Sequence, residues 1–118
     1  MIRIKRVHDR PEPADGVRVL VDGVWPRGIG KGEAAIDLWL REIAPSTELR
    51  RWFAHEPQRF EEFYRRYSAE LDERPAAVRR LLDLVRKGDV TLLFAARDRE
   101  HNNAVALLRY LRERGLAA

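Results

Sequence analysis

The stretch from residue 90 to residue 96, VTLLFAA, is the feature of this sequence that most constrains its fold. The run is apolar or small throughout, so it lacks the alternation of a strand that has one face in water. Such a run predicts the central strand of a parallel sheet, covered on both faces. The polar loop RDREHNN follows it, and then a helix that is apolar on one side and stops at Gly115. This order of strand, loop and helix indicates an α/β protein.

Two further strands are predicted near the N-terminus. Ile2 and Ile4 alternate with the basic residues Arg3 and Lys5. After a loop rich in proline, Val17, Val19 and Val21 stand at every second position. Both patterns have the period of a strand. The chain of 118 residues has the length of one domain. We therefore expect a single small α/β domain with a short, mainly parallel sheet of about three strands and helices packed on its faces.

Apolar residues at helical spacing predict four helices between the second strand and the last one. The first set is Ile36, Trp39, Leu40 and Ile43, and its helix is expected to end at Ala44 and Pro45. The next three helices are expected to begin where a capping hydroxyl or a proline suits the first turn, namely at Ser46 or Thr47, at Pro57 and at Pro75. Gly88 is expected to stop the last of them.

The residue inventory excludes several kinds of chemistry. The chain has no cysteine, which excludes disulfides, zinc–thiolate sites and thiol nucleophiles. Its three histidines are far apart and lack metal-ligand spacing, and no phosphate-binding or dinucleotide-binding glycine motif is present. We therefore expect neither a metal nor a cofactor. Because no apolar run approaches the ~18 residues of a membrane span and no signal peptide is evident, we expect a cytoplasmic protein without a membrane partner.

The charge of the chain suggests nucleic acid but its distribution does not. The formal net charge is +4 and the pI is about 9.9, and phosphate backbones bind clustered basic residues. Acidic residues are interleaved with the basic ones, as in EEFYRRYSAELDER, which is typical of solvated helix faces with local ion pairs. A nucleic-acid or protein-binding module that uses the Arg-rich helices stays open as the alternative function. The sequence does not indicate the oligomeric state.

Two loops are expected to form a ligand site, because ligands of open parallel sheets bind beyond the carboxyl ends of the strands, near helix N-termini. The loop DGVWPRG follows the second strand, and RDREHNN follows the third. In the first loop, Arg27 can hold a phosphate or a carboxylate and Trp25 can form an apolar wall. In the second loop, Arg97 can add charge and Asn102 can orient polar groups. The pattern predicts a site for a small anionic molecule.

Each of these residues also has a structural alternative. Trp25 can cover the edge of the core, Arg27 can pair with Asp22, and Asn102 can cap the last helix. Asp22 and His101 are the candidates for a general acid or base. No activated nucleophile is evident. Whether the protein is an enzyme stays open.

Five sequence blocks in fixed order resemble the YeaO-like proteins, a bacterial domain-of-unknown-function family. The blocks are KRVHD, DGVRVLVDGVWPRG, DLWLREIAPSTELRRWF, FYRRYSAEL and VTLLFAARDREHNNAVAL, and they cover almost the whole chain. Three motifs of the family are present: W-P-R-G at Trp25 to Gly28, P-S-T-E-L-R at Pro45 to Arg50, and N-x-A at Asn102 to Ala104. The resemblance implies a small α/β fold and a bacterial cytoplasmic setting, and it implies no established reaction.

The chain departs from the family pattern at two positions. His8 stands where the family tends to have Tyr, and Gly23 stands where it tends to have Arg. Arg27 is consequently the one basic side chain left in DGVWPRG. Some members of the broader superfamily carry a cysteine after the last strand, where this chain has Ala95 and Ala96, so thiol chemistry is not implied here.

Overall fold

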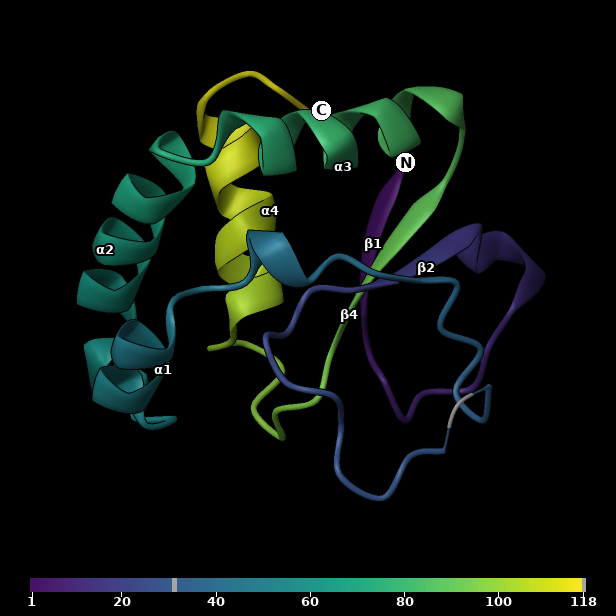
Figure 1. Cartoon of the computed structure of the whole chain (residues 1–118), viewed down its shortest axis with the longest axis horizontal. Coiled ribbons are helices and arrows are strands. Elements are labelled where there is room, and N and C mark those ends of the chain that lie inside the picture. Colours follow the sequence, from purple (N-terminus) through teal and green to yellow (C-terminus); the bar gives the residue numbers. More distant parts are fainter. Residues whose placement is uncertain (31, 118) are drawn as a thin grey trace.

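The fold is built on a four-stranded parallel sheet, as a computed structural model that describes residues 1–30 and 32–117 shows (Figure 1). The strands are β1 (Ile2–Arg6), β2 (Val17–Leu20), β3 (Leu38–Trp39) and β4 (Val90–Phe94). Their order is β1-β4-β2-β3, and every neighbouring pair is parallel. The predicted α/β class and the central position of the last strand are confirmed. The short edge strand β3 is the one addition to the three expected strands.

Helices make up most of the chain between β3 and β4 and after β4. The α-helices are α1 (Thr47–Phe53), α2 (Phe60–Asp72), α3 (Pro75–Lys87) and α4 (Asn103–Glu113). Three short 3-10 helices complete the structure: η1 (Pro13–Asp15), η2 (Arg41–Ile43) and η3 (Pro57–Arg59). The helix starts predicted at Ser46, Pro57 and Pro75 are confirmed to within one short 3-10 turn. None of the helices in the described part of the chain has the length and apolar character that crossing a bilayer requires.

The helix predicted from Ile36 to Ile43 is wrong. The segment is extended at β3 and then forms η2. Its backbone pairs with β2, since the Leu40 N–H donates to the Leu20 carbonyl at 2.9 Å. Trp39 packs on one side of the sheet and Leu40 on the other. Apolar residues divided between two faces of an extended segment thus produce the same spacing as one face of a helix.

The two faces of the sheet are covered differently. On one face, Val19, Leu92 and Phe94 pack against the four α-helices in the main core, and the helices gather on one side of the strands (Figure 1). On the other face, Leu20 and Leu93 form a second cluster. That cluster is completed by Trp39 of β3 and by apolar side chains of the long segment between β2 and β3, whose described members are Trp25, Ile29, Ala34 and Ile36. The long loop is therefore a structural layer as well as a connection.

A buried ion cluster lies at the start of β2. The Asp15 carboxylate accepts a hydrogen bond from Arg18 Nη1 at 2.7 Å and from Lys5 Nζ at 3.0 Å. Asp15 is 1% exposed and Arg18 is 3% exposed. The adjacent Gly16 has a φ of 64°, and a Cβ there would lie 2.1 Å from the Asp89 carbonyl oxygen. Only glycine therefore permits this tight approach of the two chain segments.

Candidate functional site

A cavity of about 570 Å³ opens at the carboxyl ends of β2 and β4. The loop after β2, the end of α1 and the first turn of α4 surround it. This is the edge of a parallel sheet at which ligands bind, and the volume lies within the roughly 300–1,000 Å³ of small-molecule sites. Both predicted loops contribute to the lining, the first through residues 22–27 and the second through Asn102 and Asn103. Ala95 and Ala96, at the end of the predicted strand, line it as well.

Asp22 connects the two strands at the base of the cavity. Its Oδ2 accepts a hydrogen bond from the Ala95 N–H at 2.9 Å, so the carboxylate ties the end of β2 to the end of β4. Its Oδ1 is buried and accepts no hydrogen bond from the described residues. Burial raises the pKa of Asp22. The Ala95 N–H, the Asn103 amide and the nearby side chains of Arg50 and His55 lower the pKa of Asp22 in part.

Arg50, whose charge acts on this carboxylate, is a cavity residue that the sequence did not predict as part of the site. It lies on the last turns of α1, is half-buried and lines the cavity. Within residues 1–30 and 32–117, its guanidinium donates no hydrogen bond and forms no ion pair within 4 Å, although its charge lowers the pKa of Asp22. A Cβ at Gly23 would lie 3.5 Å from Arg50 Nη1. The guanidinium therefore fills the space beside the loop where this chain lacks a basic side chain.

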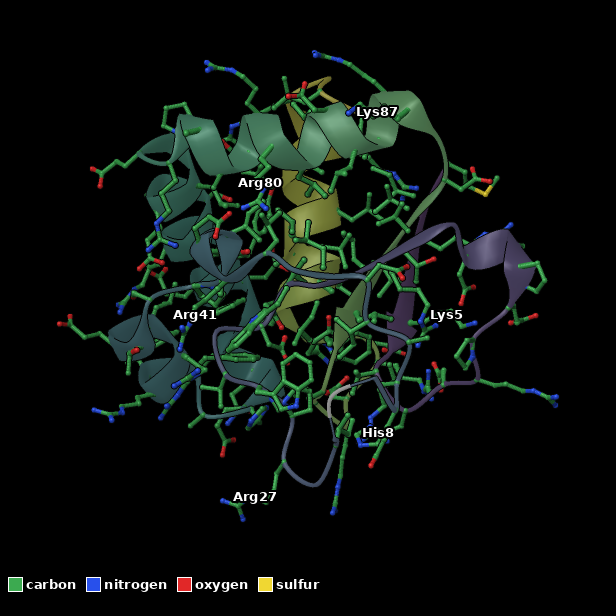
Figure 2. All side chains as sticks on the ribbon, turned by 45° about the vertical axis from the view of Figure 1, so that its right-hand side comes forward. Lys5, His8, Arg27, Arg41, Arg80 and Lys87 are labelled. Atoms are coloured by element: carbon green, nitrogen blue, oxygen red, sulfur yellow. The ribbon has the colours of Figure 1, made fainter. Side chains whose placement is uncertain are left out.

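The W-P-R-G turn forms the outer wall of the cavity. Trp25 is half-buried, donates from Nε1 to the Ile29 carbonyl at 2.7 Å and packs edge-on against Trp39 at 5.5 Å between ring centroids. Its predicted alternative role in covering the core edge is confirmed, and it lines the cavity as well. Arg27 is exposed and extends from the loop into solvent (Figure 2). In the described part of the chain Arg27 has no hydrogen bond or ion pair.

Two asparagines bring the start of α4 to the cavity. Asn102 caps the helix, because its Oδ1 accepts from the Val105 N–H at 2.9 Å while its Nδ2 donates to the Asp98 carbonyl at 2.9 Å. Asn103 donates from Nδ2 to the Val21 carbonyl at 3.0 Å. Both side chains line the cavity, so the positive end of the α4 dipole faces it.

The remaining two predicted site residues are not among the described residues that line the cavity. Arg97 is exposed. His101 has Nδ1 2.9 Å from Asp98 Oδ2 and its ring edge-on to Phe60 at 5.4 Å. The backbone N–H groups of Glu100 and His101 both donate to Asp98, and they lower its pKa. This turn holds His101 against α2.

His55 is a second residue whose position the sequence reasoning did not predict. It follows α1, where Ala54 and His55 have positive φ values of 49° and 58°, and this left-handed turn brings it to the exposed rim of the cavity. One sequence signal for this region existed: Arg50 ends the P-S-T-E-L-R motif. Nothing in that motif alone shows that α1 meets the loop after β2.

Basic side chains elsewhere are dispersed and often paired. Figure 2 shows Lys5, Arg41, Arg80 and Lys87 spread over different parts of the surface. On α2, Glu62 binds two arginines, and Arg80 on α3 binds a glutamate of η2 at 2.6 Å. The cationic groups next to a cavity are thus Arg50 and Arg27 among the described residues that line it.

Comparisons with known proteins give matches along almost the whole chain. Residues 1–117 match the model of the family described as the inactive DUF488-N3 subclade. The chain is 44% identical over 111 residues to the "Uncharacterized protein YeaO" of Escherichia coli (strain K12), covering 94% of this chain and 96% of that protein. It is 41% identical over 113 residues to uncharacterized proteins of Mycobacterium bovis and Mycobacterium tuberculosis, covering 96% of this chain and 95% of theirs. No solved structure gave a significant match.

Proposed function

Since the chain belongs to the YeaO-like family described as the inactive DUF488-N3 subclade, we propose that it is a cytoplasmic protein that binds a small anionic molecule without transforming it. The word "inactive" in the family description and the lack of cysteine both favour binding over catalysis. The site of binding is the cavity between the loop after β2, α1 and α4.

The observation that carries this proposal is the half-buried guanidinium of Arg50, which has no hydrogen bond or ion pair within 4 Å among the described residues. A cation that is partly withdrawn from water loses hydration free energy unless an anion or hydrogen-bond acceptor replaces the water. Arginine presents a planar set of donors that matches a carboxylate or a phosphate. An anion in the cavity would supply the missing acceptor. Arg27 at the rim and the positive end of α4 would add to the attraction.

The positions of the two candidate acid–base residues also support binding. Asp22 Oδ2 is engaged with the Ala95 N–H at 2.9 Å. His101 is hydrogen-bonded to Asp98 and packs against Phe60. A general acid and a general base must reach the same bound molecule, and these two side chains contact different parts of the fold. Asp22 therefore serves to position the loop in this proposal.

Replacing Arg50 with Gln is expected to weaken the binding of small anions by roughly ten- to a hundredfold, since a charge-assisted hydrogen bond contributes about 1.5–3 kcal/mol. The free energy of unfolding should change by less than about 0.5 kcal/mol, because Arg50 has no hydrogen bond or ion pair to lose within residues 1–30 and 32–117. Isothermal titration calorimetry with acetate, phosphate and phenylacetate at low ionic strength measures the first quantity. Urea unfolding measures the second.

Two matched variants control this experiment. Arg27→Gln removes an exposed cation at the rim and should weaken binding less than Arg50→Gln. Arg79→Gln removes an exposed cation of α3 and should leave binding unchanged. Equal affinity in Arg50→Gln and the unmodified protein would refute the proposal. The nucleic-acid alternative would instead be supported if the protein binds DNA and the logarithm of the association constant falls linearly with the logarithm of the salt concentration, equally in Arg50→Gln.

A further inference from the structure

We propose that the cavity selects a monocarboxylate with an apolar, ring-bearing body, in preference to inorganic phosphate or another dianion. This inference rests on the proposed function of anion binding and adds the class of the anion. It follows from the size of the cavity, from the composition of its walls and from the balance of charge at its base.

The cavity is much larger than an inorganic ion and is mostly apolar. Its volume is about 570 Å³, and Trp25, Pro26, Phe53 and Phe63 contribute to its walls. Phe53 and Phe63 stack on each other with their centroids 4.5 Å apart, so this wall is rigid and aromatic. Phe53 and Phe63 are themselves buried, and the apolar surface open to a ligand includes the half-buried Trp25 and Val24, which is 54% exposed. A compact ion at Arg50 would leave this surface in contact with water. An apolar body would cover it, which is favourable in proportion to the area covered.

Trp25 can offer the ligand only its ring surface. Its one polar group, the Nε1–H, already donates to the Ile29 carbonyl at 2.7 Å. Its ring is held edge-on to Trp39. The indole is therefore a fixed apolar wall, suited to an aromatic or aliphatic body and not to a hydrogen-bonding group.

The charges at the base of the cavity favour a single negative charge. Arg50 is the half-buried cation, and the Asp22 carboxylate lies close enough for the two charges to interact. Arg27 is exposed, so water and salt screen its contribution. His55 at the exposed rim adds positive charge only when it is protonated. The positive charges around the cavity compensate Asp22 and one further negative charge at Arg50. The second negative charge of a dianion would be repelled by Asp22 without a further cation to compensate it.

Calorimetric titration of the full chain at neutral pH and low salt with five probes tests the inference. The probes are acetate, inorganic phosphate, phenylacetate, phenyl phosphate and the uncharged phenylacetamide. Phenylacetate is expected to bind about tenfold or more tightly than each of the other four. The comparison with acetate isolates the ring, the comparison with phenyl phosphate isolates the second charge, and the comparison with the amide isolates the carboxylate.

The variant Gly23→Arg tests the charge balance separately. A Cβ at residue 23 would be 3.4 Å from Ala44 Cβ and 3.5 Å from Arg50 Nη1, so a Cβ is accommodated at van der Waals contact. The added cation beside Arg50 should raise the affinity for phenyl phosphate several-fold more than the affinity for phenylacetate. An equal change for both probes would show that charge balance does not set the selectivity, and would overturn the inference.

The outcomes separate the inference from the proposed function. If phosphate or phenyl phosphate binds more tightly than phenylacetate, or if acetate equals phenylacetate, the inference fails while anion binding stands. If the amide binds as tightly as the acid, or if none of the five probes binds, both fail. Both are supported if phenylacetate binds more tightly than the other four probes and if the Arg50→Gln variant lowers its affinity to that of phenylacetamide.

Discussion

Replacing Leu93 with Asp is expected to lower the free energy of unfolding by at least about 3 kcal/mol, because it places a carboxylate in a dry cluster without a partner. Leu93 is fully buried in the central strand β4 and packs with Val7 and Leu20 beneath the long loop. The neighbouring Lys5 is opposite Leu93 in register, but its ammonium already binds Glu12 and Asp15. Urea unfolding followed by circular dichroism measures the change.

Two other variants make this result interpretable. Leu93→Ala removes the apolar contacts without adding charge and should cost about 2–5 kcal/mol, which remains measurable if Leu93→Asp does not fold. Leu116→Asp places the same charge at a side chain that is 44% exposed, and should change stability by less than about 0.5 kcal/mol. A Leu93→Asp protein as stable as the original would contradict the central, covered position of β4.

Replacing Asp15 with Asn is expected to destabilise the fold by roughly 3–5 kcal/mol, since removing one partner of a buried ion pair leaves the other charge uncompensated. Arg18 is 3% exposed, and its guanidinium would lose the one carboxylate that it binds among the described residues. Its other guanidinium hydrogen bonds go to backbone carbonyls of Asp9, Ala34 and Ala35, and the last two hold the long loop on the sheet. Thermal and urea unfolding measure the loss.

The same cluster gives a pH dependence with a defined sign. Burial raises the pKa of Asp15, but hydrogen bonds from Lys5 and Arg18 outweigh this effect, so the pKa lies below its usual value of 3.8. A carboxyl with a depressed pKa in the folded state stabilises the fold above its unfolded-state pKa. This contribution is lost as the pH falls from there through the folded-state pKa. Stability should therefore fall less steeply below pH ~4 in Asp15→Asn than in the original protein.

The control for Asp15 is an exposed pair on α3. Asp83 binds Arg86 at 3.2 Å, with 54% and 74% of the two side chains exposed. Asp83→Asn should cost less than about 1 kcal/mol, because exposed pairs contribute little. Equal costs for Asp15→Asn and Asp83→Asn would show that burial of the cluster does not contribute to stability.

The strands of the sheet could be predicted from sequence where the hydrophobic pattern of the strand itself is distinctive. Residues 90–94 are apolar apart from Thr91 and show no alternation with charged residues, which identifies a central strand wherever the rest of the chain lies. Strand β3 has two residues and forms because the edge of β2 offers carbonyl and N–H groups to it. That opportunity depends on tertiary structure. Local spacing therefore indicated a helix for residues 36–43.

Of the candidate site, the part formed by the loop after β2 could be predicted from the sequence, and the part formed by α1 could not. Trp25 and Arg27 lie at the cavity because the loop after a parallel strand must be at the carboxyl edge of the sheet. Arg50 reaches the cavity because residues far away in the sequence hold α1 in place. For example, the Ser46 hydroxyl donates a hydrogen bond to Glu70 on α2 at 2.6 Å. His101 was expected at the site from its place in the loop, but the turn around Asp98 directs it toward Phe60. Contacts of this kind have no signal in local sequence.

An NMR titration of the isotope-labelled full chain with phenylacetate, and in parallel with phosphate, tests most directly whether the cavity beside Arg50 binds an anion. For at least one of the two anions we expect saturable shifts confined to residues 22–27, 50–55, 95–96 and 102–103, together with the Nε–H signal of Arg50. The same titration of Arg50→Gln should leave these signals in place. Shifts that do not saturate and that follow exposed arginines of α2 and α3, equally in both proteins, would contradict the site.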